Sequence, residues 1–235
     1  MKRYLGLVFA ICILAMWAIL LSYFLQYDIK QRPGLILPGL IFLTFIYTGI
    51  FITAHDAIHG TIMPRKHKLN AAIGRFCLFI YALLPYNKVR SKHFEHHRYP
   101  GSFKDPDYHN RAHRGFWAWY LHFLFTYVTW WQLFGMALIF NILHHFLHIP
   151  ITNLFIFWMA PALLSTLQLF YFGTYLPHRE PQEGYDNRHH AKSNDYSVWL
   201  SFLTCYHFGY HWEHHEYPGT PWWRLPARRK NRAQV

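Results

Sequence analysis

The sequence predicts an all-helical membrane protein, folded as a single domain over residues 1–235, and three observations support this. Of its residues, 53% are hydrophobic and only 14% are charged, against about 25% charged in a typical soluble domain. Long apolar segments alternate with short polar ones. The 23 basic residues outnumber the 11 acidic ones and flank the apolar segments. That placement is typical of cytoplasmic loops beside anionic lipid, and it argues against nucleic-acid binding.

Four segments are apolar and long enough to cross a bilayer, which takes about 20 residues of helix. The expected spans are Leu5–Leu25, Gly34–Ala54, Thr129–Phe146 and Leu154–Leu176. The first follows two basic residues, but it is too long for the apolar core of a signal peptide and no cleavage-site pattern follows it. We therefore expect a retained span whose N-terminus faces the cytoplasm.

Three further segments are expected to be helical without crossing the membrane. Ala71–Pro85 is apolar but short, with basic residues at both ends, which fits a re-entrant or interfacial helix. Phe116–Tyr127 is rich in aromatic residues, as segments at the headgroup boundary are. Val198–Tyr217 is predicted as one helix that ends at Pro218. This arrangement leaves every polar, histidine-bearing segment on the cytoplasmic side of an integral, multi-pass membrane protein.

Many of the 19 histidines fall into groups with helical spacing. Within each group the members are three or four residues apart, so on a helix their imidazoles share one face and can converge on a metal ion. The groups are His55 and His59; His93, His96 and His97; and His207, His211, His214 and His215.

Two of these groups belong to copies of one motif. The stretch from His93 to Gly101 and the stretch from His211 to Gly219 share seven of nine residues, and both contain HxxHH. Two similar half-sites from distant segments predict a metal site with approximate two-fold symmetry. We refer to the two stretches below as box 2 and box 3.

Elimination favours iron as the metal. Structural zinc takes four ligands, often with cysteine, and the three cysteines form no CxxC pair. Haem needs one or two axial histidines, and soluble diiron bundles rely on glutamates, which are scarce here. The remaining interpretation is two iron ions held mostly by neutral imidazole, with open positions for O₂.

The motifs resemble those of the membrane fatty-acid desaturase and hydroxylase superfamily, through the boxes HxxxH, HxxHH and HxxHH. Longer strings are similar to bacterial and cyanobacterial β-carotene ketolases, and the resemblance covers roughly residues 40–226. These strings are Phe51–Gly60, Asp105–His109, Leu167–Arg179 and Leu203–Pro218.

The resemblance implies an oxygenase that acts on a carotenoid in the lipid bilayer, with O₂ as co-substrate. Two hydroxylations at carbon 4 of the β-ionone ring, followed by loss of water, would convert β-carotene through echinenone to canthaxanthin. Electrons would come from an external donor protein, ferredoxin or another reductase. Carotenoid 3-hydroxylation and fatty-acid desaturation or hydroxylation remain alternatives within the same chemistry. A membrane metal-binding or transport protein is the non-enzyme alternative.

Eight histidines of the boxes are the expected metal ligands: His55, His59, His93, His96, His97, His211, His214 and His215. His178 ends the last span, where related proteins supply another histidine, so the resemblance implies a further ligand there. His207 lies one predicted turn before His211 and is a candidate ligand, with an ordinary buried histidine as the alternative. Asp56 is the candidate catalytic residue, expected to orient a metal-bound imidazole. Salt bridges to the basic loops are expected for Glu95 and Glu213.

Overall fold

A computed structural model describes residues 4–109 and 114–232, and within these ranges every regular element is helical. The helices, with short 3₁₀ or π segments marked η, are α1 Leu5–Leu25, η2 Pro33–Leu35, α2 Ile36–Ile58, α3 His67–Ala82, α4 Tyr86–Arg98, α5 Phe116–Tyr127, α6 Trp130–Asn141, η3 Ile142–Phe146, α7 Ile151–Asn153, η4 Leu154–Met159, α8 Ala160–Phe170, η5 Tyr171–Tyr175, α9 Leu176–His178, α10 Val198–Cys205, α11 His211–Glu216, η6 Trp222–Arg224 and α12 Leu225–Arg232.

Three of the described helices are long and apolar enough to cross a membrane: Leu5–Leu25, Pro33–Ile58 and Ile151–His178. They correspond to three of the predicted spans. The fourth prediction, Thr129–Phe146, differs, because α6 with η3 qualifies only together with α5 across a bend of 86°. A second bent pair, α3 with α4, turns by 104°, so the described residues hold three to five candidate spans.

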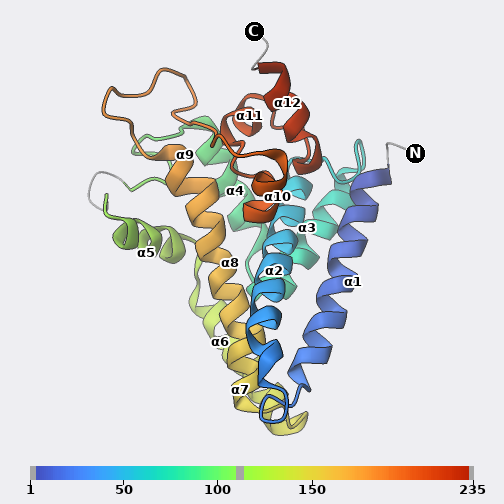
Figure 1. Ribbon diagram of the computed structural model, residues 1–235. Helices are drawn as coiled ribbons and strands as arrows, with labels where there is room; N and C mark the ends of the chain where they lie inside the picture. The colour runs from blue at the N-terminus through green and yellow to red at the C-terminus, as the bar shows by residue number, and fades with distance from the viewer. Residues whose placement is uncertain (1–3, 110–113, 233–235) are drawn as a thin grey trace.

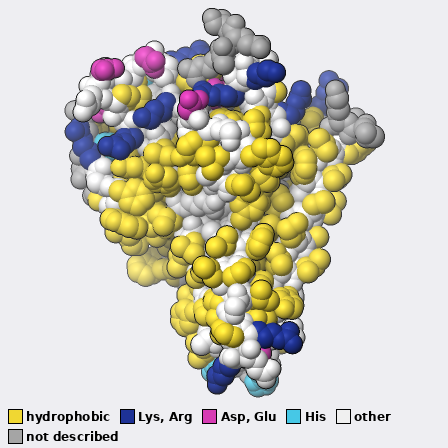
Figure 2. All heavy atoms as spheres, in the orientation of Figure 1, with side chains coloured by type: hydrophobic (Ala, Val, Ile, Leu, Met, Phe, Trp, Pro, Cys, Tyr) yellow, Lys and Arg dark blue, Asp and Glu magenta, His cyan; other side chains and the backbone are white. Residues whose placement is uncertain are grey.

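The molecule is wide at the end where α4, α11, α12 and the start of α1 lie, and it narrows toward α7 (Figure 1). Apolar side chains cover its middle, whereas Lys, Arg and acidic side chains gather at the two ends (Figure 2). Trp130 and Trp131 at the start of α6 are 86% and 83% exposed. An apolar band between two polar ends is the surface expected of a protein that lies in a bilayer.

The central helix is α2, which packs against α1, α3 and α8. Polar side chains link these helices inside the apolar core. The Thr48 hydroxyl donates to Gln168 Oε1 at 2.6 Å, and the Tyr81 hydroxyl donates to Ser165 Oγ at 3.0 Å. Hydrogen bonds of this kind hold transmembrane helices in register. The first bond fixes α2 relative to α8 and the second fixes α3 relative to α8. Helix α2 contains His55, and the span that includes α8 ends at His178.

The predicted helix Val198–Tyr217 is wrong as a single element. Helix α10 ends at Cys205 and α11 begins at His211. Between them Tyr206 and His207 have φ of 48° and 61°, the left-handed conformation that ends helices. Gly209 then lies so close to the Asn194 side chain that an added Cβ would be 2.0 Å from it. Because of this turn, His207 does not share a helix face with the three histidines of α11.

Candidate metal centre

Nine histidines of the described ranges converge in two groups at the wide end of the molecule. Cluster A contains His55, His59, His93, His97 and His214, and cluster B contains His96, His178, His211 and His215. Within each cluster one ring nitrogen from every member lies within 4.8 Å of all the others. Thus each predicted ligand except His207 belongs to one of the two clusters.

Local backbone features bring these segments together. Helix α3 ends at Ala82, and the φ of 54° at the following Leu83 turns the chain. Helix α4 starts after Pro85, which has an extended conformation. The resulting bend of 104° places α4 across the histidine-bearing end of α2. The last span reaches His178 through the π-helical segment Tyr171–Tyr175. Such segments re-aim the residues that follow and are frequent at functional sites.

The two boxes exchange ligands. Box 2 contributes His93 and His97 to cluster A and its remaining histidine, His96, to cluster B. Box 3 does the reverse, because His211 and His215 belong to cluster B and His214 belongs to cluster A. Corresponding positions of the two repeats therefore serve opposite clusters, which agrees with the two-fold symmetry expected from the repeat.

The spacing of the ring nitrogens fits bound metal ions. The Nε2 atoms of His97 and His214 are 2.9 Å apart, and those of His96 and His215 are 3.1 Å apart. Two nitrogens about 2.1 Å from one ion, at right angles, would lie about 3 Å apart. In cluster B the buried Nε2 of His178 has no hydrogen-bond partner among the described residues. A free lone pair that points into a group of imidazoles is what a metal ligand requires.

The opposite ring nitrogens of three histidines face oxygen atoms. Nδ1 of His96 is 2.9 Å from Asp105 Oδ1, and Nδ1 of His178 is 2.8 Å from the carbonyl oxygen of His190. Nδ1 of His55 lies 3.3 Å from Asp56 Oδ1. An N–H that donates to oxygen on one side of an imidazole leaves the lone pair of the other nitrogen for a metal. His96, Asp105 and Asp107 also form a close group, and both carboxylates lie on the Nδ1 side of the His96 ring.

Burial keeps the histidines of α11 neutral. Loss of solvent, and then the neighbouring imidazoles, hold the pKa of His211, His214 and His215 well below the usual range. Burial also raises the pKa of the Asp107 carboxyl to about 6. Neutral imidazoles are the form that binds metal ions, so burial of the three histidines of α11 favours metal binding over protonation of these rings.

The remaining predicted site residues lie around the clusters. Asp56 Oδ2 accepts a hydrogen bond of 3.1 Å from the Trp222 backbone N–H, so this carboxylate links His55 to the chain beyond box 3. His207 lies outside both clusters, with its ring parallel to that of Tyr210. Glu213 is fully buried and forms an ion pair of 3.3 Å with Arg229. Glu95 accepts from the Ser91 hydroxyl at the surface and forms no ion pair within the described residues, so its expected salt bridge is not found there.

Sequence reasoning did not assign Asp105 to His96, or Asp107 to any side chain. Asp107 Oδ1 accepts a hydrogen bond of 2.5 Å from the Tyr127 hydroxyl, and Tyr127 ends α5. The only sequence signal was the string Asp-Pro-Asp shortly after box 2, which by itself also fits an ordinary turn.

An apolar cavity of about 370 Å³ adjoins both clusters. Its inner wall includes His55 and His93 of cluster A and His96 and His211 of cluster B. The remaining lining comes mainly from apolar side chains of α2, α3, α5, α6 and α8. A concave apolar space with a few polar groups at one end is the usual form of a small-molecule site.

Comparison with known proteins agrees with this geometry. The sequence model of the fatty acid desaturase family matches residues 33–235. The chain belongs to the fatty acid desaturase family. The ten histidines that the sequence suggested as metal ligands, and Asp56, all lie within the matched residues.

Several curated members of the family are similar over most of this chain. A β-carotene ketolase of Haematococcus lacustris is 43% identical over 81% of this chain and 61% of its own length. A β-carotene ketolase of Paracoccus sp. strain PC1 is 42% identical over 93% of this chain and 89% of its own length. A zeaxanthin 4-ketolase of Chlamydomonas reinhardtii is 36% identical over 96% of this chain and 53% of its own length. This family member thus spans about three fifths of the Haematococcus relative. No solved structure matches it.

Proposed function

We propose that this chain is a membrane-embedded carotenoid 4-ketolase that holds two iron ions, one in each histidine cluster. The observation that carries the proposal is the apolar cavity whose inner wall contains histidines of both clusters. A lipophilic ring in this cavity would lie directly against both groups of imidazoles. The relatives named β-carotene ketolase and zeaxanthin 4-ketolase give the class of substrate and the position that is oxidised.

The proposed reaction consists of two hydroxylations and a dehydration at ring carbon 4. In each hydroxylation one C–H bond is replaced by C–OH, one oxygen atom of O₂ enters the product, and the other leaves as water. Each step consumes two electrons and two protons from outside the protein, through ferredoxin or another reductase. The geminal diol then loses water to give the ketone. The iron pair, when bound, supplies the oxidising power for cleavage of the C–H bond.

The side chains of this protein have binding and orienting roles in that scheme. The nine clustered histidines would hold the two ions, and Asp56 would orient His55 rather than touch substrate, because it does not line the cavity. Apolar walls exclude water and place the ring against the imidazoles. We propose the cytoplasmic side for the clusters because basic residues gather at the ends of the apolar segments nearest to them.

Expression in cells that make β-carotene tests this function. We expect echinenone and canthaxanthin to accumulate, and we expect about two irons per purified chain, one for each cluster. Formation of zeaxanthin would indicate 3-hydroxylation, and new double bonds or hydroxyl groups in fatty acids would indicate a lipid desaturase or hydroxylase; either outcome overturns 4-ketolation. Protein that holds only zinc or copper and leaves carotenoids unchanged would favour metal storage or transport.

A further inference from the structure

We infer that the carotenoid enters the cavity from within the bilayer, with one of its rings leading, through a lateral mouth between α8 and the α5–α6 bend. The cavity then encloses one ring end group at a time. This inference rests on the proposed function, because it takes a carotenoid as the substrate. It adds the route of access, the side chains that form it and the part of the substrate that is bound.

The mouth is defined by residues that line the cavity and are also exposed on the outside of the protein. Phe125 of α5 is 70% exposed, Leu133 of α6 is 49% exposed and Leu163 of α8 is 53% exposed. The opposite wall of the same cavity contains His55 and His211. The cavity therefore runs from the metal clusters to the molecular surface at these three side chains.

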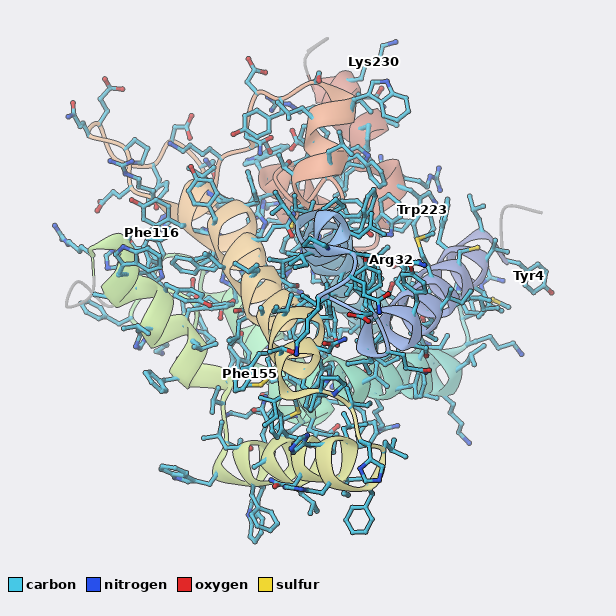
Figure 3. All side chains as sticks on the ribbon, turned by 60° about the horizontal axis from the view of Figure 1, so that its bottom comes forward. Tyr4, Arg32, Phe116, Phe155, Trp223 and Lys230 are labelled. Carbon is cyan, nitrogen blue, oxygen red and sulfur yellow. The ribbon has the colours of Figure 1, made fainter. Side chains whose placement is uncertain are left out.

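This part of the surface faces lipid. Helices α5 and α8 lie at the level of the apolar band that covers the middle of the molecule (Figures 1 and 2). Seen from the narrow end, the side chains of α5 and α6 project outward from the bundle, with Phe116 at the far end of α5 (Figure 3). A molecule dissolved in the hydrocarbon core would meet the mouth directly, without passing through water.

The chemistry of the lining selects an apolar substrate. Among the described residues that line the cavity there is no Lys or Arg, and Asp107 is the one carboxylate. Its carboxylate already accepts the hydrogen bond from Tyr127. A fatty acyl group carried on a phosphorylated or anionic carrier would need cationic side chains at the mouth, whereas a carotenoid ring needs only apolar contact.

The size of the cavity limits how much of the substrate it holds. Its volume of about 370 Å³ is at the small end of the range of roughly 300–1,000 Å³ for ligand pockets. A carotenoid is an elongated polyene with a ring at each end, so one ring and the adjoining chain fill this space. The rest of the polyene must then extend through the mouth into the lipid.

Two contacts hold the mouth at a fixed place relative to the clusters. Lys88 of α4 donates from Nζ to the backbone oxygens of Tyr127 and Val128, at 3.1 and 3.2 Å, where α5 ends. A cation at the C-terminal end of a helix is also favoured by the helix dipole. The Tyr127 hydroxyl donates a hydrogen bond to Asp107, which lies in the loop after box 2. The α5–α6 bend is thus attached to the same segments that carry His93, His96 and His97.

Bulky substitutions at the mouth test the route. Leu163→Trp and Leu133→Trp should narrow it, and Leu164→Trp and Leu138→Trp are matched controls, because these neighbours on α8 and α6 are exposed but do not line the cavity. The measurement is the initial rate of keto-carotenoid formation from β-carotene in isolated membranes, together with iron content per chain. We expect kcat/KM to fall about tenfold or more in the mouth variants, with iron content unchanged, and to stay within about twofold of wild type in the controls.

The outcomes separate this inference from the proposed function. If wild-type membranes form no keto product, the proposed function fails. If they form it and the mouth variants match their controls, only the lateral route fails. Should both Trp variants lose iron, the series Leu163→Ala, Leu163→Met and Leu163→Phe replaces them. At constant iron content the rate must then decrease as side-chain volume increases, and a rate independent of volume overturns the inference.

Discussion

Asp105 holds His96 by its Nδ1 nitrogen at 2.9 Å, on the side of the ring opposite to cluster B. The carboxylate is itself fixed, because Asp105 Oδ2 accepts from the Gly101 N–H at 2.8 Å and Asp105 Oδ1 accepts from the Asp107 N–H at 2.9 Å. It is only 2% exposed. Asp105 thereby sets both the orientation of the His96 ring and the nitrogen that is free to bind a metal.

We predict that Asp105→Asn weakens metal binding at cluster B by about 10- to 100-fold, the usual effect when the carboxylate partner of a ligating histidine is lost. The measurement is iron retained per chain against a graded series of chelator concentrations. Glu183→Gln is the control, because it removes one exposed carboxylate from the loop after α9. Equal iron retention in Asp105→Asn and Glu183→Gln would contradict an orienting role for Asp105.

The exchange of ligands between the boxes predicts how pairs of substitutions combine. His93 and His214 serve cluster A, whereas His211 serves cluster B. The double variant His93→Ala/His214→Ala should lose one metal ion and keep the other. The double variant His93→Ala/His211→Ala should lose both, because it damages each cluster once. Metal analysis of the purified variants distinguishes these outcomes, and grouping of the losses by box rather than by cluster would refute the assignment.

A comparison of His96→Ala with His122→Ala tests whether position, and not residue type, decides function. His96 belongs to cluster B, whereas His122 lies on α5 outside both clusters. We expect loss of iron and of ketolase activity in the first variant and near-normal values in the second. Similar effects of both substitutions on iron content would count against the ligand assignment.

The ion pair between the buried Glu213 and the partly exposed Arg229 predicts a contribution of α12 to stability. Glu213 is fully buried, and its Oε1 lies 3.3 Å from Arg229 Nη1, which connects α11 to α12. Arg229→Ala removes the cation and should destabilise the protein by about 1–3 kcal/mol, the usual cost of a buried polar group deprived of a partner. Thermal unfolding in detergent measures this. Lys230→Ala, at an exposed neighbouring position, should leave the midpoint unchanged.

The burial of His207 predicts that the folded protein loses stability in acid. Burial lowers the pKa of this imidazole to about 4, below the ordinary value of about 6.5 in an unfolded chain. The unfolded state therefore takes up a proton near pH 6.5, whereas the folded state does so only near pH 4. The stability that neutral His207 contributes is complete above pH 6.5 and is lost as the pH falls from there toward 4.

The measurement is the pH dependence of thermal unfolding of metal-free protein. The slope of the unfolding free energy against pH, between pH 6.5 and 4, should be smaller in His207→Gln by the equivalent of about one proton per molecule. His67→Gln is the control, because His67 is exposed at the start of α3. An unchanged slope in His207→Gln would mean that this imidazole is not responsible.

The sequence was sufficient for three of the four predicted spans and for the grouping of most of the histidines, because both follow from local periodicity. An apolar segment such as Leu5–Leu25 is helical and lipid-facing wherever it lies, and the spacing of His93, His96 and His97 determines which face of α4 they occupy. Helix spacing predicted that the histidines of each box share one face. It could not show that one histidine of each box, His96 in box 2 and His214 in box 3, belongs to the other cluster.

The errors came from long-range contacts. The break at Tyr206 and His207 depends on the close approach of Gly209 to Asn194, which no local pattern of residues reveals. Continuous helical spacing therefore placed His207 beside His211 incorrectly. The partner of His96 was missed for the same reason, because the loop that brings Asp105 back to α4 is irregular and is fixed by backbone N–H donors.

The size of the cavity has a consequence for the pigments in the membrane. Under the proposed function, a carotenoid with two rings would have to enter the cavity twice, because only one end of the molecule would lie against the clusters each time. Between the two reactions the pigment with one oxidised ring would diffuse in the lipid, where any other enzyme that acts on the unchanged ring would compete for it. The mixture of end products would then depend on the relative abundance of the competing enzymes, as well as on the selectivity of this protein.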